Sequence, residues 1–260
     1  MRRIYAHRDA LEVYDDLFEQ ADQEPEEFSD ESAYPIRQAL AHSDREGLVL
    51  ECGCGPGRIV THLSRRGYRV VGMDVHRPSL RALKKRHPEA LVVAADAAAL
   101  PFKDGALRTV LCFAALAYVP APPTPSEFRR VLEPGGRLVS TMYHCNLFMF
   151  AQMLRGLLAG RRRRFLSWCV SANEWKRLLV RHGFRPLVTE YTLYRFSIAR
   201  YLPFLARRKY SYREMRDGDR IELSPVGTFV WRAMSAFPRL FANHYCVASV
   251  LERKHDQDKA

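Results

Sequence analysis

Residues 51–57 read ECGCGPG, so three glycines alternate with other residues directly after an apolar run at residues 48–50. This pattern predicts a strand, a turn and a helix, in which the backbone amides of the turn can hold a ligand. A dinucleotide-binding turn needs G-x-G-x-x-G, but the third glycine of that motif would fall at Arg58 or Val60. The carboxylate of Glu51 would repel a pyrophosphate and attract a ligand with a cationic amino group and a sulfonium. The alternative role of Glu51 is to cap the adjacent helix.

The elements around this turn alternate between short apolar runs and helical patterns. We expect strands at residues 48–50, 68–73, 91–93, 109–113 and 137–142, and helices at residues 59–66, 78–86 and 126–132. Such an alternation builds a parallel, doubly wound sheet, so the chain is expected to be an α/β protein.

The regions before and after this core are patterned more loosely. Helices are expected at residues 8–18, 32–42, 147–158 and 171–182, strands at residues 187–194 and 245–251, and an acidic loop or lid at residues 19–31. The gap between the last two strands, roughly 50 residues, is too long for a hairpin loop. We therefore expect a largely helical insertion at residues 198–243, with amphipathic pieces at residues 198–205 and 226–241.

Several of these segments follow one another as in the class I S-adenosylmethionine-dependent methyltransferases, which the chain resembles over residues 48–143. Residues 48–57 match the first motif of the family, and Asp74 ends the second strand as the family's ribose-binding acid does. Residues 95–97 with 100–102 match its adenine-side loop, and residues 128–136 resemble the helix and turn before its fifth strand. Residues 171–184 and 244–254 resemble the helix before strand six and the antiparallel seventh strand.

The resemblance implies a doubly wound, mostly parallel, seven-stranded, Rossmann-like sheet with an antiparallel last strand and a helical insertion before it. It divides the chain into an N-terminal helical cap or lid at residues 1–46, a cofactor-binding core at residues 47–195 with 244–254, and a helical substrate lid at residues 196–243. One departure is Leu107-Arg108, where the family usually has an aromatic residue followed by Asp, and this leaves the local packing open.

S-adenosylmethionine is the cofactor that the resemblance implies. The three glycines would let backbone amides approach it without Cβ clashes, Asp74 would accept both ribose hydroxyls, and Asp96 would accept the adenine amino group. The cofactor-binding residues implied in this way are Glu51, Gly53, Cys54, Gly55, Gly57, Asp74, Val75, Asp96, Ala97 and Phe113. For Phe113 the alternative is a place in the core.

The residues just beyond the fifth strand are His144 and Tyr143, where the acceptor site of this family opens. Methyl transfer from a sulfonium is an in-line displacement, which mainly requires alignment of the reacting atoms. A base is needed for an oxygen acceptor of high pKa and assists an activated carbon. We predict catalytic roles for His144 and Tyr143, and a structural histidine is the alternative.

The sequence also restricts the acceptor. It has no Asn-Pro-Pro-aromatic tetrapeptide and no Pro-Cys pair, which the resemblance would imply for amino-methylating nucleic-acid enzymes and for pyrimidine C5 enzymes. The aromatic-rich insertion suits a lid over a hydrophobic acceptor. We therefore predict a methyltransferase for a small, hydrophobic or lipid-like acceptor, with O- or C-methylation favoured over N-methylation. The alternatives are an RNA methyltransferase and a non-catalytic RNA-binding scaffold that binds the cofactor.

Charge is distributed unevenly in this chain of net charge +12. Residues 1–46 hold 13 acids and 5 bases, whereas residues 155–213 hold 15 bases and 2 acids. The basic region fits an anionic group on the acceptor, a peripheral contact with an anionic membrane, or a solvated face, and nucleic acid is a less favoured partner.

Cysteine usage and hydropathy predict the compartment. The 6 cysteines form no disulfide framework, and no second Cys/His pair follows Cys52-x-Cys54 at a zinc spacing, so we expect no metal. No apolar run reaches about 18 residues. A cytoplasmic protein is expected, with peripheral contact at the inner membrane surface as the finer expectation; the oligomeric state stays open.

Overall fold

The computed structural model describes residues 33–113, 115–117, 123–144, 147, 171–192, 198–199, 202–209, 221–242 and 244–252. The helix expected at residues 8–18, the acidic segment at residues 19–31 and, apart from residue 147, the helix expected at residues 147–158 lie outside these residues. The arginine run at residues 161–164 also lies outside them.

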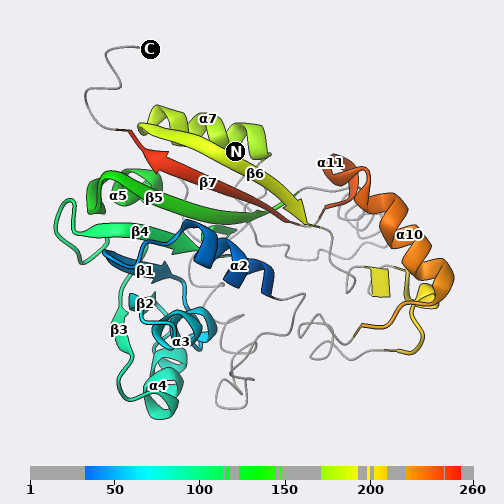
Figure 1. Cartoon of the computed structure of the whole chain (residues 1–260), viewed down its shortest axis with the longest axis horizontal. Coiled ribbons are helices and arrows are strands. Elements are labelled where there is room, and N and C mark those ends of the chain that lie inside the picture. Colours follow the sequence, from blue (N-terminus) through cyan, green and yellow to red (C-terminus); the bar gives the residue numbers. More distant parts are fainter. Residues whose placement is uncertain are drawn as a thin grey trace, which may run out of the picture.

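A seven-stranded sheet in the order β3-β2-β1-β4-β5-β7-β6 organises the described part of the chain (Figure 1). The strands are β1 (Leu48–Cys52), β2 (Arg69–Asp74), β3 (Leu91–Ala94), β4 (Leu107–Cys112), β5 (Leu132–Tyr143), β6 (Phe184–Thr192) and β7 (His244–Leu251). The pairs from β3 to β5 are parallel, and β7 runs antiparallel to both β5 and β6. This order confirms the predicted fold class.

Helices cover both faces of the sheet. They are α2 (Ala33–His42), α3 (Arg58–Ser64), α4 (Arg77–Arg86), α5 (Pro123–Val131) and α7 (Ala172–Arg181). The other described helices are α10 (Pro225–Ser235), α11 (Pro238–Phe241) and the short 3-10 helices η2 (Ala115–Ala117) and η3 (Pro203–Leu205). One core cluster joins the strands to α5 and α7, and a second joins them to α2, α3 and α4.

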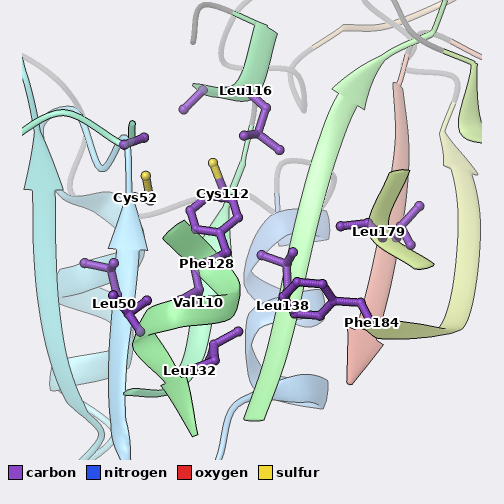
Figure 2. Packing of buried hydrophobic residues seen from close by; sticks show 14 of the residues in the cluster. Leu50, Cys52, Val110, Cys112, Leu116, Phe128, Leu132, Leu138, Leu179 and Phe184 are labelled. Atoms are coloured by element: carbon purple, nitrogen blue, oxygen red, sulfur yellow. The ribbon is translucent and has the colours of Figure 1, made fainter. Parts of the chain in front are cut away.

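Neighbouring residues of one strand belong to different core clusters. Val110 and Leu111 of β4 are both fully buried, but Val110 faces α5 and Leu111 faces α3 and α4. Figure 2 shows Val110 beside Phe128 of α5. A parallel strand covered on both faces reads as a continuous apolar run, and this explains why these strands could be recognised from the sequence.

Three of the differences from the expected boundaries have a clear structural reason. β5 begins at Leu132 and not at residue 137, because Leu132 pairs with Leu107 before a register shift. β6 begins at Phe184, three residues early, because Phe184 pairs with Leu251 of β7. The amphipathic piece at residues 226–241 is two helices, since the chain breaks before Pro238, which begins α11.

The unusual pair Leu107-Arg108 is accommodated by packing and charge. Leu107 is fully buried in the core. The Arg108 guanidinium pairs with Asp44 at 3.0 Å and with Glu133 at 2.7 Å, all three side chains being partly exposed. These contacts join the segment before β1 to the turn within β5.

One buried polar contact fixes α7 on the sheet. The indole Nε1 of Trp175 donates to Ser140 Oγ of β5 at 2.9 Å, and Ser140 Oγ lies 3.4 Å from the carbonyl oxygen of Val247. Both Trp175 and Ser140 are at most 2% exposed. The indole N–H therefore has a partner only while α7, β5 and β7 keep this arrangement.

Replacing Ser140 with alanine should destabilise the fold. Ser140→Ala leaves the buried indole N–H without its acceptor and should lower the free energy of unfolding by about 1–3 kcal/mol. Urea unfolding followed by tryptophan fluorescence measures this loss. Ser235→Ala, at an exposed position of α10, is the control and should change stability by less than about 0.5 kcal/mol. An unfolding midpoint equal to the parent's would contradict the assigned contact.

Candidate active site

The turn between β1 and α3 has glycine at positions where a side chain would not fit. Gly53, Gly55 and Gly57 have φ values of 78°, 51° and 84°. A Cβ at Gly53 would overlap the side chain of Ala115, and one at Gly57 would overlap Leu83. Positive φ and close neighbours both favour glycine here, so the turn keeps a Cβ-free cradle at the carboxyl end of β1.

The Asp74 carboxylate at the end of β2 holds this turn in place. Its Oδ2 accepts a hydrogen bond from the Gly55 amide at 2.7 Å, and its Oδ1 accepts one from the His76 amide at 2.9 Å. The amides of Gly53 and Cys54 donate to the Met73 carbonyl oxygen at 2.7 and 3.0 Å. Burial raises the pKa of Asp74, and its amide donors oppose this shift. Two strand ends are therefore joined through one buried acid.

Glu51 faces the first turn of α3. Its Oε2 accepts a hydrogen bond from the Val60 amide at 3.0 Å, and the side chain is 4% exposed. Burial raises the pKa of Glu51 well above its usual range, with the Val60 amide acting in the opposite direction. Because Gly57 caps α3 without a side-chain hydrogen bond, Glu51 supplies an acceptor that the cap lacks. Its contact with a cofactor stays a prediction.

The remaining expected cofactor residues lie at the ends of β1 to β4. Asp96 Oδ1 accepts a hydrogen bond from the Ala98 amide at 2.9 Å and is partly exposed. Ala97 and Cys54 are buried, and Val75 is 39% exposed. Phe113 is half-buried and packs against the cluster beneath α3 and α4. All of these positions therefore gather at one edge of the parallel sheet.

His144 lies at the end of β5 with one ring nitrogen committed. Its Nε2 is 2.8 Å from the carbonyl oxygen of Arg239 in α11. A carbonyl oxygen only accepts, so Nε2 carries the proton and Nδ1 of the neutral ring is an acceptor. Nδ1 is buried and has no hydrogen-bond partner among the described residues. The ring packs edge-on against Tyr191 and Tyr245, with centroids 5.3 and 6.1 Å away.

Tyr143 lies opposite His244 across the β5 and β7 pair. The two ring centroids are 4.5 Å apart. Burial lowers the pKa of His244 to about 4, which keeps that ring neutral near physiological pH. Tyr143 therefore packs with His244, whereas the next residue, His144, packs with Tyr245 and Tyr191.

Sequence reasoning missed two parts of this site. Tyr191 of β6 lies in a segment recognised only as strand-like, and its position beside His144 depends on the β6 and β7 pairing. The Arg239 group that contacts His144 is a backbone carbonyl, which leaves no mark in residue type.

The described part of the chain contains no cluster of three or more His, Cys, Asp or Glu side chains arranged to hold a metal ion. Cys52, Cys54, Cys112 and Cys246 are free and buried. None of the described helices is long and apolar enough to cross a membrane.

Residues 50–140 match the family model for a methyltransferase domain. The chain is 34% identical over 90 residues to an uncharacterized methyltransferase of Mycobacterium tuberculosis, over 35% of this chain and 37% of the relative. It is 39% identical over 92 residues to a demethylmenaquinone methyltransferase of Beutenbergia cavernae, over 35% of this chain and 38% of the relative. The matched region thus spans less than two-fifths of these relatives.

Solved structures are similar over more of the chain. A putative methyltransferase of Haloferax volcanii, in complex with its Trm112 activator, has a TM-score of 0.61 at 16% identity, over 95% of this chain and 97% of that one. The geranyl diphosphate C-methyltransferase of Streptomyces coelicolor has a TM-score of 0.57 at 17% identity, over 85% of this chain and 79% of that one. At such identities the likeness concerns the fold.

The family match assigns residues 50–140 to a methyltransferase domain, and the strand order places this segment in a mostly parallel sheet with an antiparallel β7. The cofactor of this domain is S-adenosylmethionine. The site fits it in that three residues of the turn, Gly53, Gly55 and Gly57, contribute backbone and no side chain at the carboxyl end of β1. The Asp74 carboxylate accepts hydrogen bonds from the amides of Gly55 and His76, with Val75 as a further amide donor, and its two oxygens offer about four acceptor positions, so one remains for a ligand hydroxyl.

The buried Glu51 carboxyl should make stability depend on pH. The folded chain holds this proton more tightly than the unfolded chain, so Glu51 makes the free energy of unfolding fall as the pH rises above about 4.5. Glu51→Gln keeps an acceptor for the Val60 amide, should weaken this fall, and should be at least as stable as the parent at neutral pH.

Urea unfolding at a series of pH values measures the effect. Glu46→Gln, which changes an exposed carboxylate before β1, is the matched control and should retain the parent's pH dependence. A Glu51→Gln variant with the parent's slope would show that the buried carboxyl does not control it.

Proposed function

We propose that this chain is an S-adenosylmethionine-dependent methyltransferase that acts on a small, hydrophobic or lipid-like acceptor, with O- or C-methylation favoured over N-methylation. The observation that carries the proposal is the Asp74 carboxylate, which holds the three-glycine turn at the carboxyl end of β1. This arrangement lies within the segment that matches the methyltransferase domain.

The cofactor-binding residues would act in three ways. Backbone at Gly53, Gly55 and Gly57 would approach the ligand, Asp74 would accept the ribose hydroxyls, and Asp96 would accept the adenine amino group. The remaining proposed contacts are Glu51, Cys54, Val75, Ala97 and Phe113, whose exposure ranges from buried to 39%. When bound, S-adenosylmethionine supplies a methyl group activated by a positively charged sulfur.

His144 would act as the general base. The Arg239 carbonyl oxygen holds the Nε2 proton, so the unpartnered Nδ1 is the nitrogen that can accept a proton from an acceptor hydroxyl or an activated carbon. The same carbonyl would stabilise the protonated ring by accepting from Nε2. Tyr143 would border the acceptor and supply a hydroxyl for orienting it.

The acceptor is proposed to be largely apolar. Aromatic rings of Tyr191 and Tyr245 flank His144, and the insertion that contributes Arg239 has its own apolar core. Two of the similar proteins are a demethylmenaquinone methyltransferase and a geranyl diphosphate C-methyltransferase, and both names contain an apolar compound. These points support residues 196–243 as a substrate lid on a core of residues 47–195 with 244–254. Residues 1–46 would be a cap, although α2 already contacts α3 and β5.

Cofactor binding should depend on Asp74. Asp74→Asn removes the negative charge and replaces one of the two oxygens that accept backbone amides by an NH₂ group. The affinity for S-adenosylmethionine and S-adenosylhomocysteine should therefore fall at least about tenfold. Isothermal titration calorimetry measures this. Asp104→Asn, whose side chain is 81% exposed, should retain the parent's affinity. A parent that binds neither compound would exclude the proposed function, and salt-dependent RNA binding without turnover would favour the scaffold alternative.

Turnover should depend on His144. His144→Ala removes the proposed base and should lower kcat at least about tenfold while leaving cofactor affinity unchanged. The assay follows transfer of label from methyl-labelled cofactor into a metabolite and lipid extract of the host. His182→Ala, at the end of α7, is the control and should turn over as the parent does. Equal kcat in His144→Ala would remove this residue from the mechanism.

A further inference from the structure

The helical insertion carries an apolar face that its own core does not cover. Phe204, Val226, Phe229, Phe237 and Leu240 are between 55% and 77% exposed. Every strongly exposed phenylalanine of the described chain belongs to this set, which we call the apolar face. Clustered exposure of large apolar side chains is typical of an interaction surface.

α10 separates this face from the core of the insertion. Gly227, Val230 and Trp231 face inward, where a Cβ at Gly227 would overlap the Leu205 backbone. Val226 and Phe229, one helical turn apart, lie on the other side. The inner side of α10 therefore already has its packing partners, and the exposed residues are not unfinished core.

η3 and α11 extend the apolar face at both ends of α10. Phe204 precedes Leu205, whose carbonyl oxygen accepts a hydrogen bond from the Ser224 amide at the start of α10. Phe237 stands between α10 and α11, and the Leu240 amide donates a hydrogen bond to the Phe237 carbonyl oxygen. Figure 1 places α10 and α11 at the end of the molecule opposite β3 and α4.

The charge around this face is positive. The described residues of the insertion include five bases and one acid, namely Arg207, Arg208, Lys209, Arg232 and Arg239 with Glu222. Arg232 lies on α10 three residues beyond Phe229. A second copy of this chain, with net charge +12, would bring like charges together. An anionic lipid surface fits both the exposed apolar side chains and the surrounding positive charge. Apolar side chains can enter the headgroup boundary of the bilayer, and basic side chains can contact the lipid phosphates.

We propose that the apolar face and its flanking bases dock on the surface of an anionic lipid bilayer. This inference rests on the proposed function in one respect: it assigns the bilayer as the source of the hydrophobic acceptor. α11 links the two regions, since it exposes Leu240 and holds His144 through the Arg239 carbonyl. Docking would therefore bring the membrane to the acceptor side of the site.

Vesicle sedimentation tests the docking without any need for turnover. The full chain is mixed with phosphatidylcholine vesicles with or without roughly one third phosphatidylglycerol, at low and at high salt. We expect binding to the anionic vesicles, reduced but not abolished by salt because the apolar contribution is not screened, and little binding to phosphatidylcholine alone.

Matched variants assign the binding to this face. Phe229→Ser with Phe237→Ser should lower the partition coefficient at least about tenfold, since two exposed aromatic side chains that would enter the headgroup boundary are lost. Lys209→Glu with Arg232→Glu should lower it on anionic vesicles. The controls lie on α7. Val180→Ser replaces an apolar side chain that is 57% exposed and is the control for the phenylalanine variant. Lys176→Glu with Arg177→Glu changes the net charge by as much as the other double variant does. Both controls should bind as the parent does.

Calorimetry with S-adenosylhomocysteine on each variant confirms that it is folded and separates the two proposals. A parent that binds this compound but no vesicles overturns the docking alone, whereas vesicle binding without cofactor binding overturns the enzymatic proposal alone. Equal losses in the α7 controls, or binding to RNA in place of vesicles, would also overturn the docking.

Discussion

The hydrogen bond between the Gly55 amide and the Asp74 carboxylate is the contact on which the site depends. It joins the turn after β1 to the end of β2, two strands that pair in parallel register up to Cys52 and Met73. Burying a carboxylate costs free energy unless hydrogen-bond donors surround it. The backbone amides of Gly55 and His76 are such donors for Asp74. The glycines are needed because the chain must pass this acid with positive φ and with Ala115 and Leu83 close by.

Much of the fold and the glycine turn after β1 could be predicted from sequence, because buried parallel strands are continuous apolar runs and the turn needs glycine. What depended on strand pairing could not be predicted. The early start of β5 at Leu132 and of β6 at Phe184 follows from partners distant in sequence. The Arg239 carbonyl that orients His144 is backbone, so no residue pattern indicates it. The capping contact of Glu51 was foreseen only as an alternative to cofactor binding.

The insertion connects the chemistry to the charge distribution. Its inner side forms a small core around Leu205 and Ile221, its α11 carbonyl fixes the tautomer of His144, and its outer side presents aromatic side chains among bases. If the outer side docks on a lipid surface as proposed, the positive charge of the chain would affect where an acceptor is found and how it approaches. The reaction itself would depend on the strand ends and on His144.

A crystal structure of the protein grown with saturating S-adenosylhomocysteine would test the central claim most directly, namely that the turn buttressed by Asp74 holds the cofactor. We expect ligand density over Gly53 to Gly57, with the ribose hydroxyls at Asp74 and the adenine near Asp96. Ligand density at another place, or an empty turn in crystals of the intact protein at saturating ligand, would contradict it.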